Sequence, residues 1–547
     1  MGGGSIAGTA VAAVLMVQTV TAAEPVILSV LHGARMSPPG LSGAGLVPGA
    51  VALISGANLG GRPLEALPPY ETSLGGTSVR ITPAGSQGMD APVLAASSGR
   101  VKVLVPAGFP PGAASITVTY QGQTSGPVSV TVVASNFGIF TRNGEGYGPA
   151  VAFAGDPAVP GAQPVGLSTP ARAGQMVTLR GTGLGSGGGE VTVLVGSRTV
   201  AAESAGGMPD LPGTDEVRFR LPEGDAVPDG CYVPVAVRTG EAWSNFATLA
   251  KSRDGACAHP MGLPEAVLQN LDAGKPARLG IFGLVSITVT TPTDAMLVSA
   301  VGGTFGAFGA GAVFLPGGFA PTIAPGTCTV FHSGARRLNN RALFPVPLGR
   351  GLDAGFELTL TDPAGREYGL SATERNAYEE FFLGAPPPGA GSFIGAGTWG
   401  VAGDGGDDVA PFTAELDVAA PILWTNKDAI ARIDRTQDLT VTWKATGEES
   451  GGAVVSGAVV TSGQTDILVS QFACVAPMSG GTLTVPAAIL SQLPGTGAPG
   501  ESFGALVLSN EPFSAGRRFP ADLTAGESVD AALFTYLLGD GKLLDVR

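Results

Sequence analysis

The stretch Pro48-Gly-Ala-Val-Ala-Leu-Ile-Ser-Gly-Ala-Asn-Leu-Gly60 returns in altered form as Ala173-Gly-Gln-Met-Val-Thr-Leu-Arg-Gly-Thr-Gly-Leu-Gly185. Each copy is a short apolar run, which is typical of a strand, and it ends in a Gly-rich turn. Glycine suits such a turn because it adopts positive φ without a steric penalty. The two stretches indicate an internal repeat of about 120 residues.

A second motif follows in each copy. Val101-Lys-Val-Leu-Val-Pro106 precedes Pro111-Gly112, and Val217-Arg-Phe-Arg-Leu-Pro222 precedes Pro228-Asp-Gly230. A Pro-Gly turn between two hairpin strands explains this order, because proline and glycine supply the backbone angles of the turn. Each unit then closes with one more strand and a last strand led by a serine: Ser115–Tyr120 and Ser125 in the first, Tyr232–Arg238 and Ser244 in the second.

Strand signals dominate the whole chain, and long helical periodicity is almost absent. We expect short helices as connectors, at Pro264–Leu271 and Glu374–Phe382. With 85 Gly and 44 Pro beside 44% hydrophobic residues, the composition favours many short strands over disorder. The predicted fold class is therefore all-β, with tandem immunoglobulin-like β-sandwich domains.

The order of these elements, with Phe137-Gly-Ile-Phe140 opening the second unit, resembles a known family. It is similar to the IPT/TIG-like immunoglobulin-fold domains of uncharacterised secreted acidobacterial (Solibacter-type) proteins, over about residues 26–250. The usual opening of that family is an Asn-Ala-Ala-Ser-like stretch, and here Ser29-Val-Leu-His-Gly-Ala34 stands in its place. The resemblance implies a sandwich fold and a secreted setting. It implies no activity, so no functional residue is transferred.

A chain of 547 residues is too long for one hydrophobic core, and roughly three or four domains are expected. Beyond the repeats the chain stays β-rich: Phe412–Val418 alternates cleanly, and Trp443 ends a strand whose indole suits a sandwich core. The expected units are a signal peptide at 1–23, IPT/TIG-like sandwiches at 24–134 and 135–261, a β-rich sandwich at 262–420 and a C-terminal β-sandwich at 421–547.

The N-terminus predicts export. An apolar segment at Ile6–Val20 is followed by the small residues Thr21-Ala22-Ala23, as in a signal peptide with an Ala-type cleavage site. The basic residues that usually precede such a segment are missing from residues 1–5, and a buried apolar strand is the alternative. Since no second apolar stretch of about 18 residues follows, we expect no transmembrane segment in the mature chain.

The charge balance argues against nucleic acid as a partner. The formal net charge is −14, and the densest basic groups are pairs such as Arg336-Arg337 and Arg517-Arg518. Phosphate backbones require clustered Lys and Arg, and so do anionic membrane surfaces. The acidity instead favours solubility.

Four cysteines fit an oxidising compartment, and four allow three pairings. Cys231 and Cys257 bracket the end of one domain, so we expect them to pair. Closing a loop of this size would stabilise the fold by about 3 kcal/mol, because it lowers the entropy of the unfolded chain. Cys328 and Cys474 would then form the second bridge. Free buried thiols are the alternative, and no pair has metal-ligand spacing.

Candidates for catalysis are few. His32, His259 and His332 are isolated in the sequence, and no Gly-x-Ser-x-Gly elbow joins a strand to a helix. We therefore expect no catalytic residues. Carboxylates are scattered, whereas a glycosidase needs two that converge. The four tryptophans allow a thin sugar-stacking platform, although Trp399 and Trp443 are better explained as core residues.

Gly403-Asp-Gly-Gly-Asp-Asp408 is the best candidate for a metal site. Asp404, Asp407 and Asp408 offer hard oxygen ligands in a flexible loop, which is the chemistry of Ca²⁺ binding. The loop lacks the ligand spacing of an EF-hand, and an exposed acidic turn is the competing interpretation. Gly183–Gly189 superficially suggests a phosphate loop, but no Lys-Ser/Thr ending follows, so we expect a turn there.

These observations predict a secreted, non-catalytic multidomain protein at or beyond the surface of a bacterium. Its role would be extracellular interaction, in adhesion or as a scaffold, and its partner an extracellular protein or a polysaccharide. The alternative is a carbohydrate-binding or carbohydrate-active extracellular protein with its site in residues 262–547. The sequence suggests no cofactor other than Ca²⁺ at the Asp404–Asp408 loop.

Overall fold

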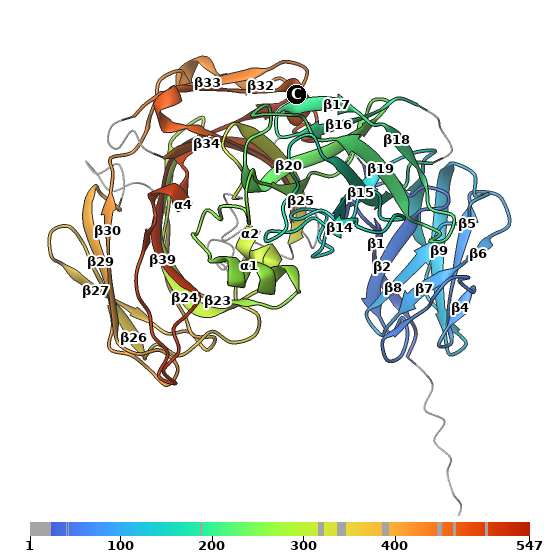
Figure 1. Ribbon diagram of the computed structural model, residues 1–547, viewed down its shortest axis with the longest axis horizontal. Coiled ribbons are helices and arrows are strands. Elements are labelled where there is room, and N and C mark those ends of the chain that lie inside the picture. The colour runs from blue at the N-terminus through green and yellow to red at the C-terminus, as the bar shows by residue number, and fades with distance from the viewer. Residues whose placement is uncertain are drawn as a thin grey trace, which may run out of the picture.

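The computed structural model describes residues 23–39, 41, 43–185, 189–314, 322–335, 346–384, 393–445, 451–462, 467–497 and 501–547. The expected signal peptide, apart from Ala23, lies outside these residues. Within them the fold is all-β, as the sequence predicts. Two sandwiches follow one another on one side of the molecule and the C-terminal half lies on the other, with helices α1 (Glu265–Asp272) and α2 (Ala310–Phe314) between them (Figure 1).

The first sandwich packs two sheets around one apolar core. One sheet has the strand order β1-β2-β8-β7-β3, and the other has β10-β9-β5-β4 with β11 on β9 and β6 on β5. Ile54 and Val101 from the first sheet meet Val79 and Ile116 from the second in this core. The strands are β1 (Val26–His32), β2 (Val51–Ala57), β3 (Leu64–Glu65), β4 (Ser73–Leu74), β5 (Thr77–Pro83), β6 (Met89–Ala91), β7 (Val93–Ala96), β8 (Arg100–Leu104), β9 (Gly112–Tyr120), β10 (Gln123–Thr124) and β11 (Val128–Val132).

The second sandwich repeats this plan. One sheet has the order β14-β13-β15-β19-β18 with β12 on β15, and the other has β17-β16-β20-β21 with β22 on β20. Its strands are β12 (Gly138–Ile139), β13 (Ala152–Ala154), β14 (Gln163–Pro164), β15 (Met176–Thr182), β16 (Val191–Val195), β17 (Arg198–Ala201), β18 (Ser204–Gly207), β19 (Asp215–Arg220), β20 (Gly230–Thr239), β21 (Ala242–Trp243) and β22 (Ala247–Lys251).

The repeat read from the sequence extends to strand register. In the first sandwich Ile54 of β2 lies opposite Val101 of β8. In the second, Leu179 of β15 lies opposite Val217 of β19. Since the side-chain period of a strand is two residues, a slip of one would turn every core residue outward. The shared register therefore shows that both copies present the same face of the motif to their cores.

The serines that lead the last strands have a structural role. Ser125 Oγ accepts a hydrogen bond from Val118 N at 3.0 Å, and Ser125 N donates to Val118 O at 2.9 Å. Ser244 and Val237 make the same two contacts, at 2.9 and 2.7 Å. Both serines are buried. Each hydroxyl thus satisfies a backbone N–H at the point where the last strand turns away from its neighbour.

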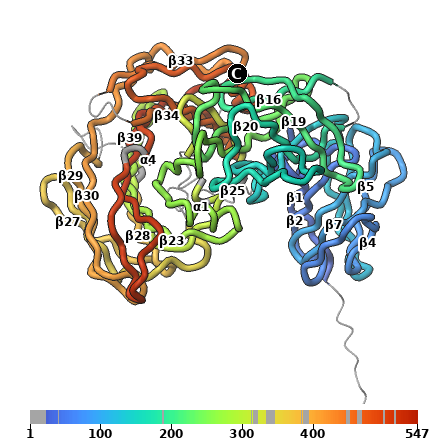
Figure 2. Tube along the Cα trace, viewed as in Figure 1, coloured from blue at the N-terminus to red at the C-terminus, as the bar shows by residue number. Residues whose placement is uncertain are grey.

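The C-terminal half is built on a ten-stranded sheet. Its order is β25-β35-β34-β37-β39-β23-β24-β28, with β32 and β38 also on β39. β23 and β39 lie side by side and parallel, although they come from opposite ends of this half (Figure 2). Its strands are β23 (Ala277–Thr290), β24 (Ala295–Phe308), β25 (Thr327–Ala335), β28 (Ala377–Gly384), β32 (Arg432–Ile433), β34 (Gly452–Ser462), β35 (Ile467–Pro477), β37 (Ser502–Asn510), β38 (Arg517–Arg518) and β39 (Ala531–Val546).

Smaller elements complete this half. A four-stranded sheet has the order β27-β26-β29-β30, and a three-stranded one has β31-β33-β36. These elements are β26 (Glu357–Thr361), β27 (Glu367–Ser371), β29 (Gly397–Gly403), β30 (Phe412–Val418), β31 (Leu423–Trp424), β33 (Leu439–Lys444), β36 (Thr482–Val485), α3 (Ala487–Leu490), α4 (Pro512–Ala515) and the 3₁₀ turns η2 (Lys427–Ala429) and η3 (Met478–Gly480).

Strand β23 contributes to two cores. Phe282 and Leu284 pack in one cluster with Trp399 and Leu416 of the four-stranded sheet. Leu279 and Ile281 lie on the opposite face of the strand, where they pack in a cluster that contains α1 and residues of the second sandwich. Successive side chains of a strand point to opposite faces, so a strand buried on both sides reads as a nearly continuous apolar run.

The expected boundary at residue 420 falls inside this shared unit. The ten-stranded sheet takes β23, β24, β25 and β28 from residues 262–420, and β34, β35, β37 and β39 from residues 421–547. The two segments therefore share the largest sheet of this half. Patterns of single strands cannot reveal this, because pairing between distant strands depends on tertiary structure.

One of the two helix predictions is wrong. Pro264–Leu271 corresponds to α1, but Glu374–Phe382 overlaps strand β28. β28 pairs along the edge of β24, from Thr304 opposite Ala377 to Leu297 opposite Gly384. The unpaired N–H and C=O groups of that edge require a partner, and this need overrides the weak local helical preference.

Both expected disulfides are present. Cys231 on β20 is joined to Cys257 across a sequence separation of 26, and Cys328 on β25 is joined to Cys474 on β35 across 146. Cys328 and Cys474 lie directly opposite each other in the strand register. Both bridges lie in cores shared by the second sandwich and the C-terminal half.

We predict that Ser244→Ala lowers the free energy of unfolding by about 1–3 kcal/mol, because the backbone N–H of Val237 is left buried without a partner. Ser125→Ala should have a similar effect through Val118. Urea unfolding followed by circular dichroism measures both. The exposed Ser129 of β11 provides the control, and Ser129→Ala should change stability by less than about 0.5 kcal/mol. Equal effects of all three changes would contradict this role.

Candidate functional site

All three histidines of the chain are built into the fold. His259 is 6% exposed, its Nδ1 accepts from Met261 N at 3.2 Å, and its Nε2 lies 3.0 Å from the Tyr232 hydroxyl. Because Nδ1 is an acceptor, the ring proton is on Nε2 and is donated to Tyr232. Burial lowers the pKa of His259 to about 4. This histidine is a neutral structural link.

The other two histidines lie beside Arg35. His32 is fully buried at the end of β1, and its Nδ1 accepts from the backbone N–H of Arg35 at 3.2 Å. His332 on β25 has its Nδ1 3.0 Å from Ser470 Oγ. Burial, and secondarily the charge of Arg35, lower the pKa of His32 to about 3 and that of His332 to about 4. Residues that are 300 positions apart are thus brought to one arginine.

Arg35 joins the first sandwich to the second. It lies in the turn after β1 and is 6% exposed. Its Nη1 donates to the carbonyl of Phe137 at 3.3 Å and to the carbonyl of Trp243. Burial lowers its pKa to about 10, so the guanidinium keeps its charge at neutral pH.

Further polar contacts fix this junction. Asn136 Nδ2 donates to the carbonyls of Gly43 and Gly45 at 2.8 and 2.7 Å. Thr182 Oγ1 accepts from Val51 N at 3.0 Å. The hydrogen bonds run in both directions between the sandwiches, and they define one relative orientation of the two units.

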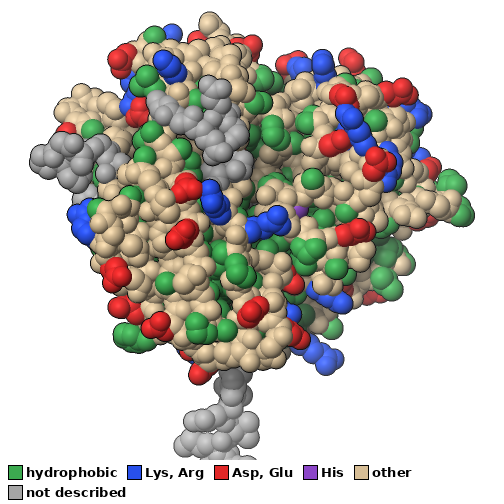
Figure 3. Space-filling view, turned by 60° about the vertical axis from the view of Figure 1, so that its left-hand side comes forward, with side chains coloured by type: hydrophobic (Ala, Val, Ile, Leu, Met, Phe, Trp, Pro, Cys, Tyr) green, Lys and Arg blue, Asp and Glu red, His purple; other side chains and the backbone are tan. Residues whose placement is uncertain are grey.

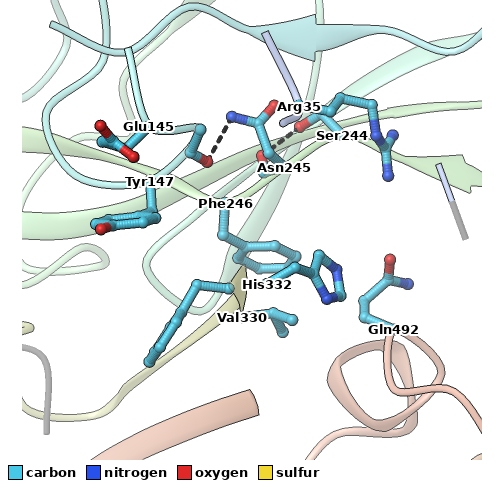
Figure 4. Close-up of a pocket in the computed structure, with 11 residues that line it drawn as sticks. Arg35, Glu145, Tyr147, Ser244, Asn245, Phe246, Val330, His332 and Gln492 are labelled. Atoms are coloured by element: carbon cyan, nitrogen blue, oxygen red, sulfur yellow. Dashed lines mark hydrogen bonds between the residues drawn. The ribbon is translucent and has the colours of Figure 1, made fainter. Parts of the chain in front are cut away.

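A small cavity lies where the two sandwiches meet the C-terminal half. Its volume is about 10 Å³. Arg35 comes from the first sandwich, Asn245 from the second, and His332 and Gln492 from the C-terminal half (Figure 4). Asn245 is fully used by backbone partners, since it binds Ile139 N and O and Gly146 O.

A larger and shallower groove lies on the second sandwich, with a volume of about 420 Å³. Side chains of mixed polar type line it, among them the amides of Gln163 and Gln175, the hydroxyl of Thr169, the guanidinium of Arg172 and the carboxylate of Glu265. Apart from Glu265 at the start of α1, its lining lies before residue 262. The sequence, in contrast, predicts a sugar site in residues 262–547.

The loop that the sequence predicts as a metal site makes contacts within the protein. Asp404, Asp407 and Asp408 are exposed between β29 and β30. Asp408 Oδ2 accepts from Asp353 N at 2.8 Å, and the carbonyl of Asp407 accepts from the Thr524 hydroxyl at 2.7 Å. Among the described residues no group of three or more His, Cys, Asp or Glu is arranged to hold a metal ion.

The glycine-rich stretch that follows β15 begins as a turn. Gly183 and Gly185 have φ of +95° and +70°, which L-residues rarely adopt. A Cβ at Gly183 would lie 2.7 Å from Asn136 O and 2.8 Å from His32 Nε2. Glycine is required here because the first sandwich packs against this turn. Residues 186–188 of the stretch lie outside the described residues.

The tryptophans serve mainly as core residues. Trp399, Trp424 and Trp443 are at most 5% exposed, and each indole N–H has an acceptor. Trp243 is half-buried beneath Arg238. In the C-terminal half the exposed ring of Phe393 meets Tyr368 at an interplanar angle of 70°, so this pair forms no flat platform.

Surface charge is dispersed. On the face shown in Figure 3, acidic and basic side chains are interspersed, and neither sign gathers into one patch. Among the described residues, no helix is long and apolar enough to span a membrane.

Comparison with known proteins gives no family. No protein-family model matches the sequence, and no curated protein is similar enough to count as a relative.

Similar solved structures include a tetra-tandem repeat from the extending region of a large adhesion protein, at 12% identity, with 96% of this chain and 100% of that chain covered and a TM-score of 0.15. Another is SGBP-B of Bacteroides ovatus in complex with a mixed-linkage heptasaccharide, at 12% identity, 64% and 69% coverage and a TM-score of 0.20. Domains 5-6 of the S-layer protein SbsC match at 13% identity, 42% and 98% coverage and a TM-score of 0.17. Such low scores carry no argument about function.

The sequence does not reveal the junction. It indicates that the three histidines are isolated, and Arg35 has no motif around it. A residue of this kind is identified by burial and by its contacts with other domains, which depend on the packing of units distant in the chain. The histidine pair around Arg35 is likewise a product of tertiary structure.

We predict that stability falls as the pH drops from about 6.5 toward about 4. His332 has a lower pKa in the folded state than its ordinary 6.5, so the unfolded chain binds more protons in that window and is favoured there. Between pH 7 and pH 5, His332 should account for a loss of about 2 kcal/mol.

Urea unfolding at both pH values tests this prediction. His332→Gln should lose about 2 kcal/mol less than the wild type on acidification. Val330→Ala, a change on the same strand that adds no titrating group, should show the wild-type loss. An identical pH dependence in His332→Gln and the wild type would show that His332 does not contribute to the loss of stability.

Proposed function

We propose that this protein is a secreted, non-catalytic multidomain protein that acts outside a bacterial cell by binding an extracellular protein or a polysaccharide. The observation that carries the proposal is that the side chains best suited to chemistry are engaged in structure. His32 and His259 are buried, the pKa of each of the three histidines is lowered, Asp408 binds backbone, and three tryptophans fill cores.

The way the units are joined supports a scaffold or adhesion role. Tyr232 of the second sandwich shares a core with Ile281 of the C-terminal half, and Phe246 shares another with Trp443. Arg35 and Asn136 add polar contacts to the first sandwich. A body held in this way presents its loops at fixed positions, which lowers the entropy cost of binding.

An extracellular location accords with the two disulfides, because such bridges persist in oxidising compartments. We also infer that the two sandwiches are IPT/TIG-like domains of the acidobacterial type. The equal registers of β2 with β8 and of β15 with β19 support a common origin of the two units.

The test is a binding screen paired with an activity screen. The purified chain is immobilised and exposed to extracellular proteins and cell-envelope polysaccharides, and it is also incubated with chromogenic glycosides and esters. The proposal expects saturable binding to at least one immobilised class and no turnover. Turnover that is abolished by point changes in one pocket would overturn the non-catalytic assignment.

The groove on the second sandwich favours one second candidate, carbohydrate binding. Amide, hydroxyl and charged side chains give the directional donors and acceptors that a sugar requires, and about 420 Å³ accommodates one or two rings. Gln163 is exposed at the groove, and no hydrogen bond of its side chain is described.

We predict that Gln163→Ala weakens glycan binding about 5- to 10-fold, which corresponds to one lost hydrogen bond. A glycan array identifies the ligand. Titration calorimetry then measures the affinity of the wild type and of Gln163→Ala for that ligand. Gln123→Ala, at an exposed position of β10 in the first sandwich, should leave affinity unchanged. An array without binding would exclude carbohydrate as the partner, while an unchanged affinity in Gln163→Ala would place the sugar elsewhere.

A further inference from the structure

The cavity at the junction of the three units contains a positive charge without a negative partner. The hydrogen bonds described for the guanidinium of Arg35 run from Nη1 to two backbone carbonyls, and Nε is buried with no partner. A buried cation is normally paired, as Lys251 is with Asp229 at 2.6 Å. Within the described residues, Arg35 forms no ion pair.

The charge is retained at neutral pH. Burial lowers the pKa of Arg35 only to about 10, so the side chain remains protonated. Carbonyl oxygens offset part of this charge as dipoles, but they do not neutralise it. An unneutralised buried charge is unfavourable, and an anion nearby would be bound by the same field.

His332 brings an N–H donor to the same cavity. Its Nδ1 lies 3.0 Å from Ser470 Oγ, and when the Ser470 hydroxyl donates to Nδ1 the ring proton is on Nε2. Burial and the charge of Arg35 keep this ring neutral at pH 7. A neutral imidazole can then donate to an anion without adding a second positive charge.

The other polar groups around the cavity leave room for such an anion. Ser244 and Asn245 use their side chains on backbone partners. Glu145 is exposed and forms no ion pair among the described residues, while Gln492 lies beside His332 and Arg35 (Figure 4). The volume of about 10 Å³ restricts the cavity to a very small ligand.

We propose that this cavity binds a single monatomic anion, such as chloride, between Arg35 of the first sandwich and His332 of the C-terminal half. The anion neutralises the guanidinium and accepts a hydrogen bond from the imidazole. It thereby links two units that are not adjacent in the sequence. The site is independent of the partner-binding role proposed above.

Thermal unfolding of the full chain tests the proposal. Chloride is titrated against gluconate at constant ionic strength, so that general screening does not change. The expected result is a saturable rise of Tm with chloride, and also with bromide, because an anion that binds only the folded state stabilises it by mass action. In crystals soaked with bromide, an anomalous peak should lie between Arg35 and His332.

Variants separate this site from general salt effects. Arg35→Gln should weaken the apparent affinity for chloride, read from the dependence of Tm on chloride concentration, about tenfold or more, since a charge-assisted contact is lost. His332→Phe keeps the arginine but removes the donor, and it should weaken the response as well. Arg180→Gln is the control, because Arg180 is paired with Glu216 at 3.2 Å in the second sandwich and should respond like the wild type.

The carboxylate of Glu145 competes with a bound anion as the negative partner of Arg35. The variant Glu145→Gln distinguishes these two partners. Under the proposal, this change leaves the chloride response unchanged or makes it stronger. If Arg35→Gln fails to fold, two other measurements test the proposal. They are the anomalous bromide peak in the wild type and the dependence of Tm on chloride in folded His332→Phe. A Tm that does not depend on chloride together with no bromide peak would overturn the proposal, as would a chloride response that appears only after Glu145 is removed.

Discussion

The need to cover both faces of the ten-stranded sheet organises this molecule. Phe282 and Ile281 are neighbours on β23, yet they belong to two different cores. Neither face can be left to water, because each is lined by large apolar side chains. The four-stranded sheet covers one face, and α1 with part of the second sandwich covers the other. The second sandwich is therefore part of the core of the C-terminal half.

The two sandwiches are attached by different physical means. The second shares apolar cores with the C-terminal half, and Tyr232 and Phe246 are among its contributions. The first is held mainly by Arg35, Asn136 and Thr182 through hydrogen bonds to backbone. Apolar burial tolerates small shifts, whereas hydrogen bonds specify distance and direction. The polar junction consequently fixes the orientation of the terminal unit.

Buried charge is handled in two ways within one chain. Lys251 is 1% exposed and is neutralised by Asp229, in the manner usual for buried cations. Arg35 is surrounded by carbonyl groups and by histidines that burial keeps neutral. The first arrangement balances the charge, whereas the second leaves the charge unpaired and Nε of Arg35 without a hydrogen-bond partner. The difference is what makes the junction cavity chemically distinct from the rest of the interior.

The sequence by itself determined the strand content and the two repeated units, because turn chemistry and period-two patterns are local properties. It allowed three pairings of the four cysteines and favoured the pairing that the structure shows. It also indicated that Trp399 and Trp443 are core residues. Tertiary structure alone decided that β28 is a strand, that segments on both sides of residue 420 share one sheet, and that His32 and His332 meet at Arg35. These features depend on contacts between residues far apart in the chain, which no local pattern encodes.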